Sequence, residues 1–172
     1  LQASGGGEAS GGSSDDASDG GAGTVTLVTH DSFNISEETL AAFEAESGYD
    51  VVQVAPGDGG SLGNQLILTK ASPLGEVVYG IDNSFASRAV NEGVLEPYVS
   101  PDLPASAEAY LLGDELTPIN RGDVCLNIDT GWFAEAGLTP PSTLEDIADP
   151  AYKGLTVVTN TATSSPGLAF LL

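Results

Sequence analysis

"TVTLVTHDSFNISEETLAAFEAESGYDVVQVA" (residues 24–55) places two apolar segments on either side of a helical one. The first, residues 24–30, is rich in β-branched residues and predicts a buried strand. Residues 36–48 predict a helix, because Ser36 can cap its start and Gly48 can end it. The "YDVVQVA" that follows predicts a second strand. A strand, a helix and a strand at this spacing indicate a parallel βαβ unit.

The alternation continues along the chain. A Gly-rich turn and helix at 56–72, a strand at 76–82 and a helix at 83–93 are expected next, followed by strand segments within 115–129, helices at 130–137 and 142–150, and a strand at 153–159. Ser142 and Glu145 have the spacing of a capping box for one of these helices. This order predicts an α/β fold with doubly wound parallel sheets.

In doubly wound sheets, ligands bind beyond the carboxyl ends of the strands. The turns expected there contain His30-Asp31-Ser32, Asp58-Gly59-Gly60-Ser61, Asp82-Asn83 and Thr163-Ser164-Ser165. These turns are therefore the candidate positions of a functional site.

The chain is strongly acidic, with 25 acids against 4 bases. Nucleic acids and anionic lipid headgroups are poor partners for such a chain, because binding phosphate requires clustered Lys and Arg. A cationic ligand would be attracted by the field of the protein. Solubility is an alternative explanation for most of the charge. Cys125 is the only cysteine, so this sequence contains no intramolecular disulfide.

Residues 1–23 consist of Gly, Ser, Ala, acids and little else. This composition cannot bury enough apolar surface to fold, and it predicts a flexible tether. The first four residues, Leu1-Gln2-Ala3-Ser4, are similar to a bacterial lipobox in which Ser4 takes the place of the lipidated Cys. A cloning remnant or an ordinary disordered terminus explains these residues equally well.

No set of catalytic residues is visible in the sequence. The glycines of "GDGGSLG" lack the Lys of a phosphate-binding P-loop, and a single His without paired cysteines is a weak basis for a metal site. Asp58 could attract a cation or could cap the following helix. Asp31 could likewise be a ligand residue or a cap, and His30 could stack on a planar ring or fill a strand end.

"TSSPG" (163–167) is the most informative of the turns. Ser165 is a natural N-cap and Pro166 a natural first helical residue. The free N–H groups at such a helix start suit an oxyanion, and the hydroxyls of Ser164 and Ser165 add donors. Ordinary helix capping is the alternative explanation.

Four segments, "TLVTHDSF", "VAPGDGGSLGNQL", "EVVYGIDNSF" and "TSSPGLAFLL", occur in the order seen in a known family. Together they resemble the thiamine-binding subunits of bacterial ABC importers, which belong to the two-lobed periplasmic solute-binding proteins. The resemblance runs from about Thr26 to Leu172. Each motif alone is weak, and their order makes the set specific.

The resemblance implies two α/β lobes with the ligand in the cleft between them. Residues 24–115 would form most of the first lobe, residues 116–127 a hinge crossing, and residues 128–172 the start of a second lobe. We expect this to be a truncated chain that lacks the rest of the second lobe. The family also implies an importer permease as partner, an extracytoplasmic location with a possible lipid anchor, and no catalysis.

The family's Asp-Gly after the second strand contacts thiamine, which carries over to Asp58 and Gly59. Its Ser/Thr pair before Pro-Gly carries over to Ser164 and Ser165. Relatives have an aromatic residue where this chain has His30. In the segment "PINRGDVCLN", this chain has Arg121 and Asp123 where relatives carry aromatics.

The expected ligand is thus thiamine or one of its phosphate esters, with no further cofactor. A related binder of ferric iron or a polyamine remains an alternative, although the scarcity of His and clustered Tyr disfavours iron. An enzyme on the same fold is a more distant alternative, because no nucleophile and base are paired.

Overall fold

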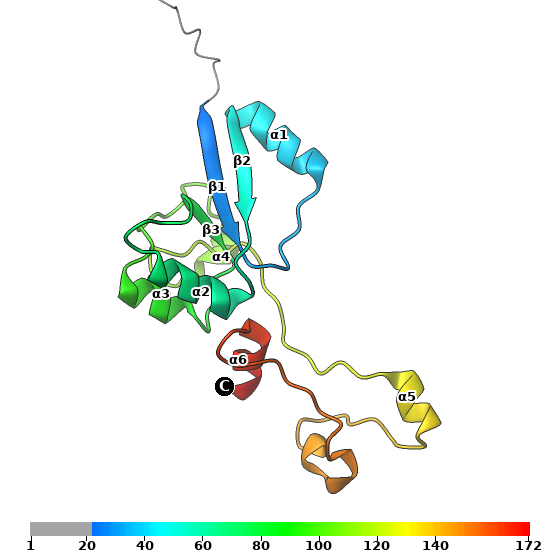
Figure 1. Ribbon diagram of the computed structural model, residues 1–172. Coiled ribbons are helices and arrows are strands. Elements are labelled where there is room, and N and C mark those ends of the chain that lie inside the picture. Colours follow the sequence, from blue (N-terminus) through cyan, green and yellow to red (C-terminus); the bar gives the residue numbers. More distant parts are fainter. Residues whose placement is uncertain (1–21) are drawn as a thin grey trace, which may run out of the picture.

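The computed structural model describes residues 22–172 and contains a three-stranded parallel sheet (Figure 1). The strand order is β2-β1-β3, with β1 at Gly23–Thr29, β2 at Tyr49–Val54 and β3 at Val77–Tyr79. The central strand pairs in parallel with both neighbours. The predicted α/β class with a parallel sheet is confirmed. The tether and lipobox predictions concern residues 1–23, of which residues 1–21 lie outside the described part.

Helices connect the strands and continue after the sheet. They are α1 (Glu37–Ser47), α2 (Gly59–Leu68), α3 (Ala86–Glu92), α4 (Ala105–Glu108), α5 (Thr130–Glu135), the 3-10 turns η1 (Asp146–Ala148) and η2 (Pro150–Tyr152), and α6 (Ser165–Leu171). The caps predicted for α1 are confirmed: the Ser36 side chain accepts from the Thr39 N–H, and Gly48 ends the helix at φ 75°. A positive φ favours glycine, which has no Cβ to clash.

The core of the described part lies between the sheet and α2. Val28 of β1 and Leu62 of α2 are fully buried, and Leu66 is nearly so. Partly buried side chains of Leu74, Val78, Ile81 and Val94 pack against them. Each buried aliphatic side chain stabilises the fold by roughly 1.5–3 kcal/mol. This cluster holds the carboxyl ends of β1 and β3 in place over α2.

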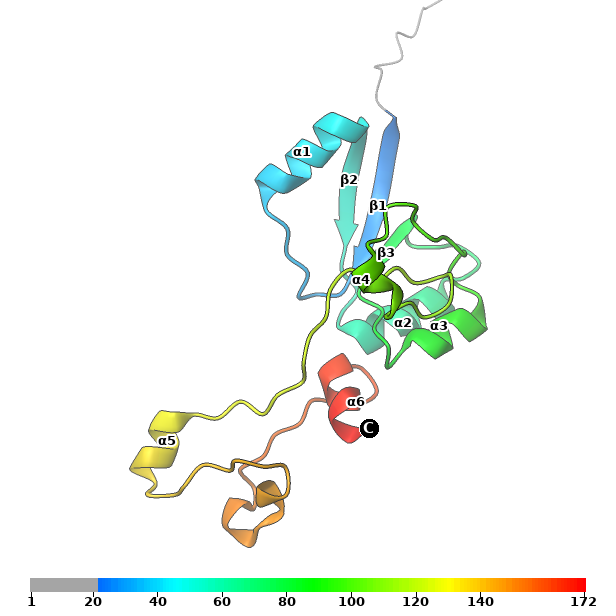
Figure 2. The same ribbon diagram turned by 180° about the vertical axis from the view of Figure 1, so that it is seen from behind.

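Helix α1 lies beside β2, away from α2 and α3 (Figures 1 and 2). None of its residues is buried. Its apolar side chains are therefore only partly covered, and Phe43 is 51% exposed.

Two predictions of strands are wrong. Residues 115–129 and 153–159 contain no strand, and Ile119 and Val157 are among their exposed side chains. Residues 115–129 leave the sheet and lead to α5, and residues 153–159 lead from η2 to α6 (Figure 1). Apolar and β-branched residues favour a strand only when a neighbouring strand accepts and donates their backbone hydrogen bonds, and within residues 22–172 no strand lies beside them.

The helix predicted over residues 142–150 is also wrong, since the structure has the short turns η1 and η2 there. The capping contacts are shifted by one residue from the predicted Ser142–Glu145 box. The Thr143 hydroxyl accepts from the Asp146 N–H at 3.2 Å, and the Asp146 carboxylate accepts from the N–H groups of Ser142 and Thr143. These hydrogen bonds lower the pKa of Asp146, because they stabilise its charged form.

Candidate functional site

The turns after the three strands meet at the carboxyl edge of the sheet. The His30 N–H after β1 donates to the Tyr79 carbonyl of β3 at 3.2 Å, and the Asp31 N–H donates to the Gly57 carbonyl after β2 at 3.0 Å. Backbone hydrogen bonds thus fix the turn after β1 to both neighbours. This is the edge at which parallel α/β sheets bind ligands.

The His30 ring is held in one orientation. Its Nδ1 accepts from the Ser32 N–H at 3.2 Å, which assigns the remaining proton of the neutral ring to Nε2. The ring centroid lies 5.6 Å from that of Tyr79, with 32° between the planes. A Cβ on Gly80 would lie 2.5 Å from His30 Cδ2, so only glycine lets the ring approach this closely.

Asp58 caps α2 and also lines the depression at the strand ends. Its Oδ1 accepts from the Gly59 N–H at 2.7 Å, and its carbonyl accepts from the Leu62 N–H at 2.8 Å. The capping alternative is therefore confirmed. A role toward a ligand remains a prediction, because the half-buried carboxylate also faces the depression.

Residues 162–165 reach back from the end of the chain to the start of α2. The Gly60 N–H donates to the Thr163 carbonyl at 3.1 Å. A Cβ on Gly60 would lie 2.7 Å from the Ala162 carbonyl oxygen, and one on Gly59 would collide with Ser165 Oγ. The two glycines thus allow residues far apart in sequence to meet, and α6 lies next to α2 in both views (Figures 1 and 2).

Helix α6 begins one residue earlier than predicted. Ser164, with extended φ and ψ angles of −120° and 127°, is the N-cap, so Ser165 and not Pro166 is the first helical residue. Ser164 is buried and its N–H donates to the Asn160 carbonyl at 2.9 Å. Its side chain makes no capping hydrogen bond. The next turn is equally crowded, since a Cβ on Gly167 would lie 2.5 Å from the Thr159 carbonyl oxygen.

A broad depression covers this edge of the sheet. Four of the six predicted site residues line it, namely His30, Asp58, Gly59 and Ser165. Asp31 is exposed and Ser164 is buried, and neither lines the depression. Its volume of about 2160 Å³ exceeds the roughly 300–1,000 Å³ of small-molecule pockets. A small ligand would therefore occupy only part of it.

Sequence reasoning missed three residues that also line the depression, Phe33, Tyr79 and Asn120. Tyr79 lies inside the strand predicted over residues 76–82, three residues before the Asp82 turn, and Phe33 lies two residues after Asp31. Both positions near predicted turns were signals. Nothing in the sequence indicated Asn120, because its contact with Tyr79 joins positions 41 residues apart.

Carboxylates outnumber cations around the depression. The acidic lining residues are Asp58, Glu76, Asp82, Glu96, Glu115 and Asp123, and the basic ones are Lys70 and Arg121. The Thr26 N–H donates to the Glu76 carboxylate at 2.8 Å and lowers the pKa of Glu76, which keeps it ionised. Asp82 accepts from the Ser84 N–H at 2.8 Å at the turn before α3. The excess negative charge favours a cationic ligand.

The described residues 22–172 contain no group of three or more His, Cys, Asp or Glu residues placed to hold a metal ion. None of their helices has both the length and the apolar character needed to cross a membrane.

The chain is similar to known proteins over most of its length. Residues 72–172 match the family described as bacterial extracellular solute-binding protein. A thiamine-binding periplasmic protein of Brucella suis is 29% identical over 156 residues, which cover 87% of this chain and 45% of the relative. The thiamine-binding periplasmic protein of Salmonella typhimurium is 25% identical over 152 residues, which cover 86% and 45%. The chain therefore spans less than half the length of these curated relatives.

Proposed function

This chain belongs to the bacterial extracellular solute-binding proteins, and we propose that the protein captures thiamine or a phosphate ester of thiamine for an ABC importer. The family is one of binding proteins, so we propose no catalysis. The proposed partner is an importer permease. The proposed location is outside the cytoplasm, as the name of the Brucella suis relative indicates for that protein.

One observation carries the proposal. The start of α2 at Asp58-Gly59, the end of β1 at His30 and the start of α6 at Ser165 line one acidic depression. Thiamine has a permanently positive thiazolium ring and a planar aminopyrimidine. A carboxylate attracts the first, and an aromatic ring stacks on the second.

We assign each residue a role that fits its position. Asp58 faces the thiazolium, because its half-buried carboxylate opens into the depression. His30 supplies a planar ring, which takes the place of the aromatic residue in relatives. Ser165 offers a hydroxyl to a polar group of the ligand. The buried Ser164 and the exposed Asp31 shape the turns around the site.

The proposal also includes the two-lobed arrangement. Residues 24–115 are proposed to form most of one lobe, residues 116–127 to cross between lobes, and residues 128–172 to begin the other. The contact between Gly60 and Thr163 would then join the two lobes beside the ligand.

Isothermal titration of the complete protein, including any sequence beyond these 172 residues, tests the proposal. Thiamine, its monophosphate and its diphosphate are the ligands, and spermidine and ferric citrate represent the two alternatives. Saturable binding of thiamine or a phosphate ester is expected, with spermidine and iron weaker. Binding of spermidine or iron without thiamine would replace the proposal by that alternative.

A Ser165→Ala variant tests the role of the α6 start, and Ser164→Ala is the control because the buried Ser164 does not line the depression. If the Ser165 hydroxyl binds phosphate, Ser165→Ala loses more affinity for thiamine diphosphate than for thiamine, because charge-assisted hydrogen bonds are roughly twice as strong as neutral ones. Equal losses for the two ligands would contradict a phosphate role and leave a ligand contact. No loss for either ligand would reduce the segment to helix capping.

A further inference from the structure

Three rings gather at the edge of the depression. Tyr79 at the end of β3 lies between His30 and Phe33, with ring centroids 5.6 Å from the first and 4.9 Å from the second. All three side chains are half-buried and line the depression together with Asp58. We call His30, Phe33 and Tyr79 the ring cluster. Its central member is Tyr79, because both other rings pack against it.

Tyr79 is fixed at both ends. Its backbone belongs to β3, where it pairs with Thr29, and its carbonyl accepts from the His30 N–H. Its hydroxyl accepts from Asn120 Nδ2 at 2.6 Å. Asn120 is exposed, lies in the segment 116–127, and is 41 residues from Tyr79 in sequence. Asn120, from the segment 116–127, therefore holds the hydroxyl end of the Tyr79 ring, which lines the site.

We propose that Tyr79 is a ligand-contacting residue that determines specificity for a planar cation, and that Asn120 is the positioning residue that orients its ring. This inference rests on the proposed function and names the aromatic part of that site. Neither residue is needed for the core, since the buried cluster consists of Val28, Leu62 and Leu66.

The physical basis is the fixed orientation of the ring. An aromatic face attracts a cation, and a nearby carboxylate such as Asp58 adds to the attraction. A ring that is already immobile loses little conformational entropy when the ligand binds. Without the Asn120 amide, only the neighbouring rings would limit rotation of the Tyr79 side chain, so part of that entropy would be lost on binding.

The test is a double-mutant cycle on thiamine affinity in the complete protein, measured by isothermal titration. Tyr79→Phe and Asn120→Ala each release the hydroxyl end of the side chain at position 79, so each is expected to weaken binding by roughly threefold to tenfold, which is the usual cost of immobilising one side chain. The double variant is expected to bind no more weakly than either single variant, because the two residues act through one contact. Tyr79→Leu, which removes the ring, is expected to weaken binding by about tenfold or more.

Matched controls are Tyr49→Phe, at the opposite end of the sheet, and Asn91→Ala on α3, since neither residue lines the depression. Thermal unfolding is measured in parallel. Unchanged affinity for Tyr79→Phe and Asn120→Ala, with or without a lower midpoint of unfolding, would overturn this inference and leave the proposed function standing. Additive losses in the double variant would overturn the positioning role of Asn120. Failure of the parent protein to bind thiamine would overturn both.

Discussion

Residues 23–115 and residues 116–163 contain similar runs of apolar and β-branched residues, and the two parts behave differently. In the first part, β1 has a parallel partner on each side and contributes the fully buried Val28. In the second part, Val157 is 92% exposed and no strand forms. The difference shows that strand propensity is realised only where other strands satisfy the backbone.

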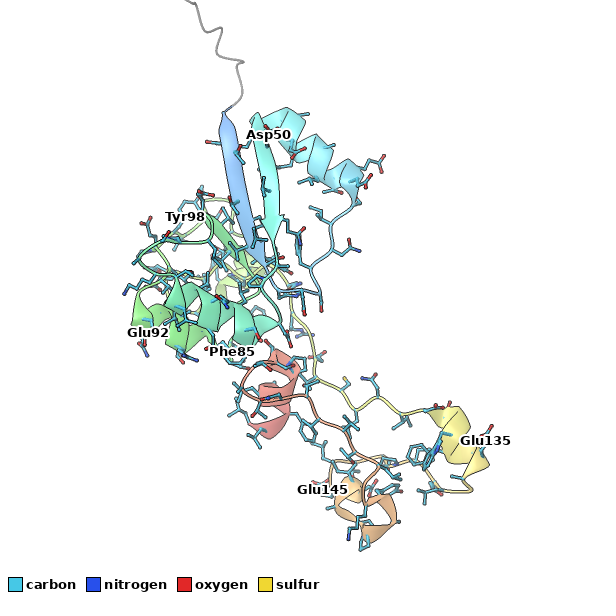
Figure 3. All side chains as sticks on the ribbon, in the orientation of Figure 1. Asp50, Phe85, Glu92, Tyr98, Glu135 and Glu145 are labelled. Atoms are coloured by element: carbon cyan, nitrogen blue, oxygen red, sulfur yellow. The ribbon has the colours of Figure 1, made fainter. Side chains whose placement is uncertain are left out.

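Helix capping, which depends on neighbouring residues only, occurs in both parts. Asp58 caps α2 in the first part, and Asp129 caps α5 in the second by accepting from the Trp132 N–H at 3.0 Å. The region around α5, η1 and η2 is separate from the sheet, as the distant positions of Glu135 and Glu145 show in Figure 3. Capping needs residues only a few positions apart, so it does not depend on the rest of the fold.

The comparison is tested most strongly by truncating one apolar side chain in each part. Leu62→Ala is expected to lower the free energy of unfolding by roughly 2–5 kcal/mol, because Leu62 is fully buried in the core. Val157→Ala, the control, is expected to change it by less than about 0.5 kcal/mol. Urea unfolding followed by circular dichroism measures both. A large effect at Val157 would mean that the second part is packed in solution.

Asp58 lies two residues before Gly60, which contacts Thr163 of the second part, and its charge can be removed while its cap is kept. Asp58→Asn is expected to weaken thiamine binding by about tenfold or more, since a charge-assisted contact contributes roughly 1.5–3 kcal/mol. Asn caps helices about as well as Asp, so unfolding should change little. Asp50→Asn, at the far end of β2 (Figure 3), is the control. Parent-like affinity in Asp58→Asn would refute the ligand role.

The contact between the two parts can be broken at a glycine. Gly60→Ala places a Cβ 2.8 Å from the ring of Phe85 and 2.7 Å from the Ala162 carbonyl oxygen. Such crowding is expected to cost about 1–3 kcal/mol or to push residues 162–165 away from α2. Backbone NMR shifts of those residues report the displacement. Gly122→Ala, where a Cβ meets nothing within 4 Å, is the control and is expected to leave the shifts unchanged.

The smallest expected effect is the response of two carboxylates, Asp146 and Glu76, to low pH. The pKa values of Asp146 and Glu76 are both lowered by hydrogen bonds from backbone N–H groups, chiefly that of Ser142 and that of Thr26. The stabilisation is therefore complete above the ordinary carboxyl pKa and is lost as pH falls through the lowered value. In NMR titrations, the Ser142 amide is expected to follow Asp146, and the Thr26 amide of β1 is expected to follow Glu76. Asp146→Asn should abolish the Ser142 response and leave the Thr26 response, and titration at an ordinary carboxyl pKa would contradict the hydrogen bonds.

The sequence was sufficient to predict features that depend on neighbouring residues. The βαβ unit, the caps Ser36 and Gly48, and the meeting of strand-end turns are examples. Segment 153–159 has the residues of a strand, and its conformation depends on partners that no local pattern specifies. The site residues also divide into those that local sequence predicts and those that only the tertiary fold brings in. His30 and Asp58 were predicted from strand ends, whereas Asn120 reaches Tyr79 only through the tertiary fold.

The exposure of α1 sets the rate at which its hydrogens exchange with solvent. Because none of its residues is buried, unfolding this helix leaves the contact between Val28 and α2 intact. An isolated helix of this length is marginal in water, so we expect α1 to open without global unfolding and its amides to exchange with a low protection factor. The amides of β1, which is paired on both sides, exchange only when the sheet itself opens. The N-terminal βαβ unit is thus one structural motif with two distinct stabilities.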